Sequence, residues 1–176
     1  RMMAYSSISH AGYMLFAIVA VSITSGSSIL VYATAYSLAS VIAFGALILV
    51  KRRTGSDHFE SFNGLAKRDP WLAVVLTIAM LSLAGIPLTA GFIGKFMMFN
   101  QVMGAFNVTL LVLAAINAAV GVYYYLHVVV NMYFKVPAND HAKGLDISLN
   151  YKVVLTIAAL LTLVLGIYPD IILAFL

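Results

Sequence analysis

Residues 82–95 read SLAGIPLTAGFIGK, near the middle of a chain of 176 residues. They interrupt an apolar stretch over residues 71–104, which as one straight helix would measure roughly 50 Å against a hydrocarbon core of about 30 Å. Pro87 removes a backbone donor and clashes with the preceding turn, while Gly85 and Gly91 permit unwinding. The pattern therefore predicts a helix that is broken between Gly85 and Gly91.

Four further apolar stretches flank this one, at about 4–23, 27–50, 107–134 and 152–174. Hydrophobic residues make up 63% of the chain and charged residues 9%, with a mean hydropathy of +1.03, whereas soluble domains carry roughly a quarter charged residues. Each stretch is long enough to cross a bilayer, which takes about 20 residues. We expect an all-α integral membrane protein, with residues 1–176 forming one membrane domain of about five transmembrane helices. Because the chain opens at Arg1 rather than methionine, we also expect it to be part of a longer protein.

The charges follow an alternating up-and-down path through these helices. Nine of the ten basic residues precede the first stretch or lie in the second and fourth connections, so all nine fall on one side. The positive-inside rule makes that side cytoplasmic and predicts a C-terminus on the periplasmic side. Basic residues spread over loops in this way do not form a nucleic-acid-binding face.

Lys95 is the one basic residue that departs from this path. Counted back from the expected outer end near Gly104, it lies about 14 Å deep at 1.5 Å per residue. A charged lysine at that depth costs at least ~2.5 kcal/mol and normally faces a polar interior. We interpret it as part of an ion or proton pathway. The alternatives are a side chain that extends to the interface and a structural pairing with carbonyls exposed at the break.

Polar residues in the other stretches extend this interpretation. Ser6, His10 and Tyr13 share one face of the first helix at helical spacing, and His10 is a candidate relay because histidine titrates near neutrality. A histidine that is merely hydrogen-bonded to serines is the alternative. The tyrosines of the second helix, Tyr32 and Tyr36, are interpreted as packing residues.

A second polar stripe is expected along the fourth stretch, from Asn117 through Tyr124 and His127 to Asn131. It is either a set of interhelical hydrogen bonds or a hydrated path from Lys95 to the cytoplasm, with His127 as the best candidate relay. The chain has no cysteine, no phosphate-binding glycine loop and no histidine pair at helical spacing. We therefore expect no cofactor or metal in this chain.

Three segments together resemble a known family: RMMAYSSISHAGY at 1–13, SLAGIPLTAGFIGKF at 82–96 and VYYYL at 122–126. The chain resembles subunit N of the NADH-quinone oxidoreductases, an antiporter-like subunit of respiratory complex I, over almost its whole length. The resemblance implies that the helices are the last five of fourteen. It also implies that Lys95 is the lysine of the broken helix in the second inverted repeat, and that its acidic partner belongs to sequence outside this chain.

This resemblance also implies a function. The chain would be part of a non-redox, proton-translocating subunit in the bacterial inner membrane, coupling quinone reduction elsewhere in complex I to proton transfer through Lys95. Other membrane and peripheral subunits would be its partners and would handle NADH, flavin, iron–sulfur clusters and quinone. Relatives often have arginine where His127 stands. The alternatives are a subunit of a multi-subunit sodium/proton antiporter or membrane-bound hydrogenase, and a structural membrane module in which Lys95 is paired and inaccessible to water.

Overall fold

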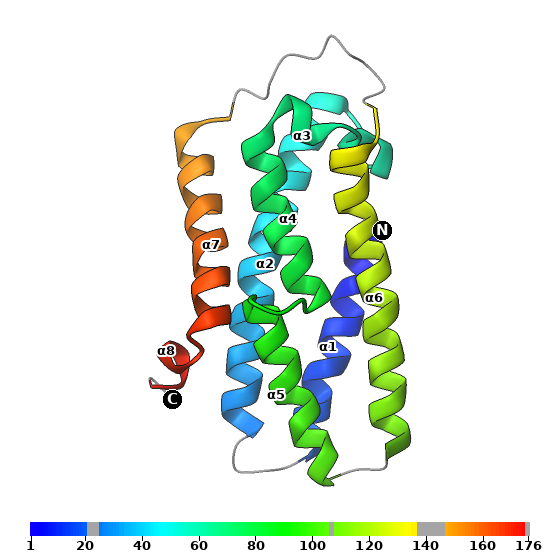
Figure 1. Ribbon diagram of the computed structural model, residues 1–176, viewed down its shortest axis with the longest axis vertical. Helices are drawn as coiled ribbons and strands as arrows, with labels where there is room; N and C mark the ends of the chain where they lie inside the picture. The colour runs from blue at the N-terminus through cyan, green and yellow to red at the C-terminus, as the bar shows by residue number, and fades with distance from the viewer. Residues whose placement is uncertain (21–24, 106–107, 137–146, 175–176) are drawn as a thin grey trace.

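The described part of the chain is a bundle of long helices with two shorter half-helices stacked end to end (Figure 1). The computed structural model describes residues 1–20, 25–105, 108–136 and 147–174. The six longer helices are α1 (Met2–Ala20), α2 (Ser25–Thr54), α4 (Pro70–Ala84), α5 (Ala90–Ala105), α6 (Val108–Phe134) and α7 (Leu149–Ile167). The short elements are η1 (Phe59–Phe62), α3 (Leu65–Arg68) and α8 (Asp170–Leu173).

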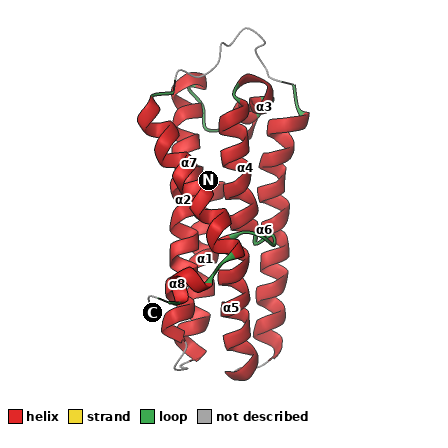
Figure 2. Ribbon diagram, turned by 60° about the vertical axis from the view of Figure 1, so that its left-hand side comes forward, coloured by secondary structure: helices red, strands yellow, loops and turns green. Residues whose placement is uncertain are grey.

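The predicted break in the third helix is confirmed. α4 ends at Ala84 and α5 begins at Ala90, and the connection between them lies near the middle height of the bundle (Figures 1 and 2). In the described residues, three segments are long and apolar enough to cross a membrane by length and composition: Gly26–Thr54, Leu111–Phe134 and Leu149–Ile167. α4 is apolar but shorter, so the third crossing needs both half-helices.

α2 is the central helix and packs against α1, α4, α5 and α7. The face of α2 that meets its neighbours is built from small residues at helical spacing, which lets the backbones approach closely. Its buried alanines are Ala35, Ala39, Ala43 and Ala46. A Cβ added to Gly45 would lie 2.8 Å from Leu155 of α7, so this contact also depends on a missing side chain.

The last helix ends earlier than the stretch 152–174 predicts, because α7 stops at Ile167. Pro169 has no backbone N–H and disfavours the helical conformation of the residue before it. Tyr168 accordingly leaves the helix with φ −123° and ψ 72°, and the separate helix α8 follows. The stretch expected over about 152–174 is thus divided between α7 and α8, and the periplasmic position of the C-terminus stays a prediction.

The basic loop between α2 and α4 is held by two contacts to the helices around it. Arg53 at the end of α2 pairs with Asp69 just before α4, at 3.0 Å between Nη1 and Oδ2. The Gly64 amide donates to the Asn131 carbonyl of α6 at 3.1 Å. Arg1 lines the same cavity as loop residues 57–59. This loop and the end of α6 thus gather at one end of the bundle, called the basic end below, whereas the chain begins part-way down the bundle (Figure 1).

Candidate functional site

The C-terminus of α4 determines which backbone groups are available at the break. Gly85 takes the left-handed conformation, with φ 82°, and its amide donates to the carbonyls of Leu81 and Ser82, each at 3.0 Å. The Ile86 amide also donates to Leu81, at 3.0 Å. This is the Schellman arrangement that commonly ends a helix at glycine. It satisfies the carbonyls of residues 81 and 82 and leaves those of residues 83 and 84.

Those two carbonyls, of Leu83 and Ala84, would each need a donor four residues further on to continue the helix. For Leu83 that residue is Pro87, which has no N–H. For Ala84 it is Leu88, whose φ of 73° turns the chain out of the helical direction. Both carbonyls therefore point from the end of α4 into the break, at the negative end of the helix dipole.

α5 begins within contact distance of the same turn. The Gly91 amide in its first turn donates to the Ser82 hydroxyl of α4 at 3.1 Å. The Thr89 hydroxyl donates to the Ile86 carbonyl at 2.7 Å. A Cβ on Gly91 would lie 1.9 Å from the Ser82 carbonyl oxygen. The close contact between the two half-helices thus requires glycine at position 91.

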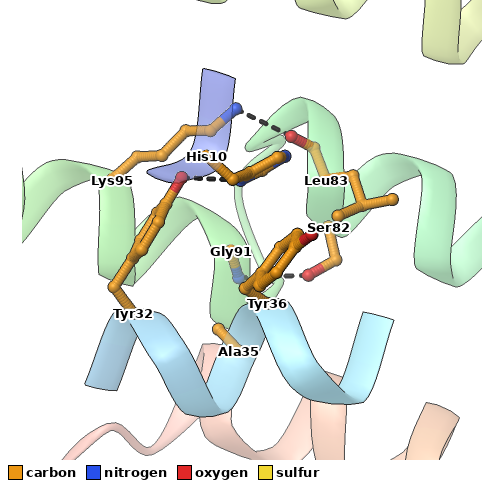
Figure 3. A pocket seen from close by; sticks show the side chains of 8 residues that line it. All are labelled: His10, Tyr32, Ala35, Tyr36, Ser82, Leu83, Gly91 and Lys95. Atoms are coloured by element: carbon orange, nitrogen blue, oxygen red, sulfur yellow. Dashed lines mark hydrogen bonds between the residues drawn. The ribbon is translucent and has the colours of Figure 1, made fainter. Parts of the chain in front are cut away.

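Lys95 extends from the second turn of α5 back to the end of α4 (Figure 3). Its ammonium donates to the Leu83 carbonyl at 2.7 Å and to the Ala84 carbonyl at 3.0 Å. Helical side chains lean toward the N-terminus of their own helix, which brings the ammonium to the break. The Tyr13 ring lies 5.6 Å from the same nitrogen, within the range of a cation–π contact. The residue is only 7% exposed, so its charge is compensated by carbonyl dipoles inside the protein.

A cavity of about 10 Å³ lies beside Lys95 (Figure 3), about the size that one water molecule needs. Its lining comes from α1, α2 and the two half-helices: His10, Tyr32, Ala35, Tyr36, Ser82, Leu83, Gly91 and Lys95. A cavity of this size does not admit a cofactor. Among the described residues, no three His, Asp or Glu side chains are grouped so that they could hold a metal ion.

His10 shares this cavity with Lys95. Its Nδ1 is 2.7 Å from the Tyr32 hydroxyl of α2, and its Nε2 is 3.0 Å from the Tyr125 hydroxyl of α6. The Tyr125 hydroxyl is also hydrogen-bonded to the Ser6 hydroxyl. The Tyr36 ring stacks on the imidazole with 4.7 Å between centroids. His10 is 3% exposed, so both ring nitrogens are hydrogen-bonded in a buried position between three helices.

The face that the sequence predicts on the first helix is buried as a unit. Ser6, His10 and Tyr13 are each less than 5% exposed. The Asn117 side-chain amide donates to the Tyr13 hydroxyl at 3.0 Å, and Tyr13 itself donates to the Ala114 carbonyl at 3.5 Å. The polar face of α1 therefore meets α6 and α2, not lipid.

The predicted polar stripe along α6 does not form one path. His127 lies against Phe59 and Tyr123, with ring centroids 5.4 and 6.2 Å away, and it does not line the Lys95 cavity. Tyr125 points to His10, and residues two apart on a helix point about 200° apart. Asn131 is buried at the basic end, where its carbonyl binds the Gly64 amide. The structure thus brings His10, and not His127, to Lys95.

Comparison with known proteins identifies the family of this chain. The family model described as "NADH:quinone oxidoreductase/Mrp antiporter, TM" matches residues 1–137. The chain belongs to this family. The match includes the broken helix, Lys95 and the tyrosine and histidine residues around it.

Curated relatives in this family are named NADH-quinone oxidoreductase subunit N. The protein from Cytophaga hutchinsonii is 37% identical over 98% of this chain, and subunit N 1 from Solibacter usitatus is 42% identical over 99%. The chain covers 37% and 36% of those two proteins. It therefore spans little more than a third of the length of the relatives that it matches.

Solved structures show the same antiporter-like fold. A chain of respiratory complex I from Thermus thermophilus is 33% identical and superposes with a TM-score of 0.84, covering 98% of this chain and 38% of the other. A chain of the Mrp complex from Dietzia sp. DQ12-45-1b superposes with a TM-score of 0.86 at 18% identity, over 97% and 40%. The Mrp similarity concerns the fold, whereas the complex I similarity extends to the sequence.

Two residues at the site of this family member were not predicted as functional. The sequence interpretation assigned Tyr32 to packing and gave Tyr125 no role, yet their hydroxyls bind the two ring nitrogens of His10. Spacing did not single out Tyr125, because Tyr125 lies four residues after Gly121 while Tyr124 lies three after Gly121 and seven after Asn117. Tyr124, which the sequence placed in the pathway, packs its ring 4.5 Å from that of Tyr125.

Proposed function

We propose that this chain is part of a proton-translocating membrane subunit of NADH:quinone oxidoreductase, in which Lys95 carries the proton. The observation that supports this most directly is the Lys95 ammonium, buried in the break and held by two carbonyls of the preceding half-helix. The subunit would lie in a bacterial inner membrane. Other membrane and peripheral subunits of complex I would be its partners and would hold flavin, iron–sulfur clusters, NADH and quinone.

The surroundings of Lys95 suit a side chain that binds and releases a proton. Two carbonyl dipoles at the negative end of α4 stabilise a protonated Lys95, and they stabilise a neutral amine less. The same low-dielectric surroundings make the charged form sensitive to any charge that changes nearby. Quinone reduction elsewhere in the complex could then drive proton uptake and release at Lys95 through its electrostatic surroundings, without redox chemistry in this chain.

Two other candidate functions predict different experimental results. The Mrp similarity makes a multi-subunit sodium/proton antiporter the second candidate. Copurification of the complete protein with flavin- and iron–sulfur-containing subunits supports complex I, and a purely membranous assembly supports the antiporter. A structural membrane module is the third candidate, because it too would hold Lys95 on carbonyls and away from water.

Substitution of Lys95 separates a proton carrier from a structural cation. In the complete complex, we expect Lys95→Ala and Lys95→Arg each to lower the protons pumped per NADH to below about half of the wild-type value, because arginine keeps the charge but does not release its proton. Proton uptake by inverted membrane vesicles and NADH oxidation are measured on the same sample. Lys67→Ala, at an exposed position of the basic loop, is the control and should pump normally. Wild-type pumping by Lys95→Arg would show that Lys95 is a structural cation.

A further inference from the structure

We propose that Ser6, Tyr125, His10 and Tyr32 form a hydrogen-bonded proton relay between a large cavity at the basic end and the Lys95 cavity. The inference rests on the proposed function, since it names the route by which protons would reach Lys95. Its central elements are the hydroxyls of Tyr32 and Tyr125, which lie on different helices and bind opposite sides of the His10 ring. The three helices α1, α2 and α6 all contribute to it.

The upper end of the relay lies beneath a cavity of about 700 Å³. Arg1, Asp57 and His58 are its polar lining, and Met2, Met3 and Val128 are among its apolar lining residues. Residues three or four apart on a helix lie on the same face. Ser6 is therefore one turn below Met2 and Met3, and Tyr125 is one turn from Val128. Neither Ser6 nor Tyr125 lines the cavity itself, so one turn of α1 and one turn of α6 separate their hydrogen bond from it.

The middle of the relay can carry a proton because each member is both a donor and an acceptor. A neutral imidazole has one N–H and one bare nitrogen, and a tyrosine hydroxyl can donate one hydrogen bond while accepting another. His10 therefore donates to one tyrosine and accepts from the other. The 2.7 and 3.0 Å distances are short enough for either direction. Stacking of Tyr36 on the ring keeps both nitrogens aligned with their partners.

The lower end of the relay is the small cavity that Tyr32, His10 and Lys95 line together (Figure 3). Tyr32 is held next to Lys95 by the absence of a side chain at Gly94, where a Cβ would lie 2.8 Å from the tyrosine ring. Tyr32 is 1% exposed. Its hydroxyl therefore lies in the protein interior. Within the same cavity, the Lys95 amine can accept its proton once that amine is neutral.

One transfer moves every proton by one position. The Ser6 hydroxyl receives a proton from the large cavity and passes its own to Tyr125, which passes its own to Nε2 of His10. The Nδ1 proton of His10 passes to Tyr32, and the Tyr32 proton passes across the small cavity to the neutral amine of Lys95. The ring ends in its other tautomer, and the chain is reset when the hydroxyls rotate and the ring returns to its first tautomer. One proton enters, one proton leaves, and no group of the relay stays ionised.

Removal of one hydroxyl at a time tests the relay in the complete complex. We expect Tyr125→Phe and Tyr32→Phe each to slow proton pumping several-fold and to change its solvent isotope effect. Tyr123→Phe is the matched control: Tyr123 lies on the same helix as Tyr125, but it is 74% exposed and does not line the Lys95 cavity, so pumping should be unchanged. Difluorotyrosine at position 125 keeps the ring and the hydrogen bond but makes the hydroxyl more acidic, and it should shift the pH profile of pumping. The same analogue at position 123 should not.

The outcomes separate this inference from the function on which it rests. If Lys95→Ala, run in parallel, loses pumping while both phenylalanine variants pump at the wild-type rate, the relay is overturned and the proposed function stands. If Lys95→Ala pumps normally, the proposed function fails. If the phenylalanine variants do not assemble, the fluorinated tyrosine decides, and an unchanged pH profile at position 125 overturns the relay.

Discussion

Gly91→Ala is expected to prevent the two half-helices of the broken helix from packing together. The added Cβ would lie 1.9 Å from the Ser82 carbonyl oxygen and 2.7 Å from its carbon. Both are backbone atoms, so no side-chain rotation relieves the contact. Separation of the helices would also break the bond from the Gly91 amide to the Ser82 hydroxyl. Overpacking costs typically 1–3 kcal/mol and occasionally more. We expect a loss of about 3 kcal/mol here, roughly a hundredfold change in the folding equilibrium.

The amount of assembled protein in membranes and its thermal midpoint after solubilisation measure this effect. Gly12→Ala in α1 is the matched control, because a Cβ there meets nothing within 4 Å and alanine favours a helix interior. Gly12→Ala should assemble as well as wild type. Wild-type levels and thermal stability for Gly91→Ala would show that the half-helices are not packed in the way described here.

A second large effect is expected from Gly166→Ala at the end of α7. A Cβ there would lie 2.5 Å from the Leu88 carbonyl oxygen and from the Thr89 Cα and carbonyl carbon. These are again backbone atoms, and they belong to the connection between the half-helices. We expect a loss of about 2–3 kcal/mol. Since a shift of residues 88 and 89 also displaces the end of α4, the protein that still assembles should pump fewer protons per NADH.

Assembly and pumping are measured together for this variant. Gly26→Ala in α2 changes the same residue type in another helix, where a Cβ meets nothing within 4 Å, and it should leave both quantities unchanged. Normal pumping by the assembled Gly166→Ala protein would contradict a link between α7 and the site. Normal assembly would contradict the close contact itself.

The position of the break follows from the sequence because its causes are local. Gly85 supplies the left-handed conformation that ends α4, and Pro87 withholds the next donor. The sequence also raised the pairing of Lys95 with carbonyls as an alternative, and this is the arrangement that the structure contains. Which two carbonyls are involved depends on the hydrogen bonds of the Schellman turn, and these could not be counted before the end of α4 was known.

The stripe predicted on α6 includes Tyr124 and His127 where the structure buries Tyr125 and Val128, and the reason is the composition of that helix. Tyr123, Tyr124 and Tyr125 follow one another, so three neighbouring faces each carry a polar group. Periodicity alone cannot choose among them. The structure buries Tyr125 with Gly121 and Val128, and the choice is made by the partners on α1 and α2. The spacing of residues along a single helix does not predict such tertiary contacts.

α7 ends before the apolar stretch that predicted it. The apolar composition continues past Ile167, and a template of about 20 apolar residues accepts it. The proline at position 169 carried the correct signal, because the residue before a proline avoids the helical region. The contact of Gly166 with the break could not be predicted, since it joins segments that lie far apart in the sequence.

The contacts at the basic end have a mechanical consequence. The Arg53–Asp69 ion pair ties the start of α4 to α2, and the Gly64–Asn131 hydrogen bond ties the same loop to α6. Axial sliding of α4 would strain both ties, so relative motion of the two half-helices is concentrated in the residues that join them. Lys95 spans that joint, with its Cα on one half-helix and its ammonium on the other. A displacement of either half-helix would therefore change the distances between the Lys95 ammonium and the two carbonyls that bind it.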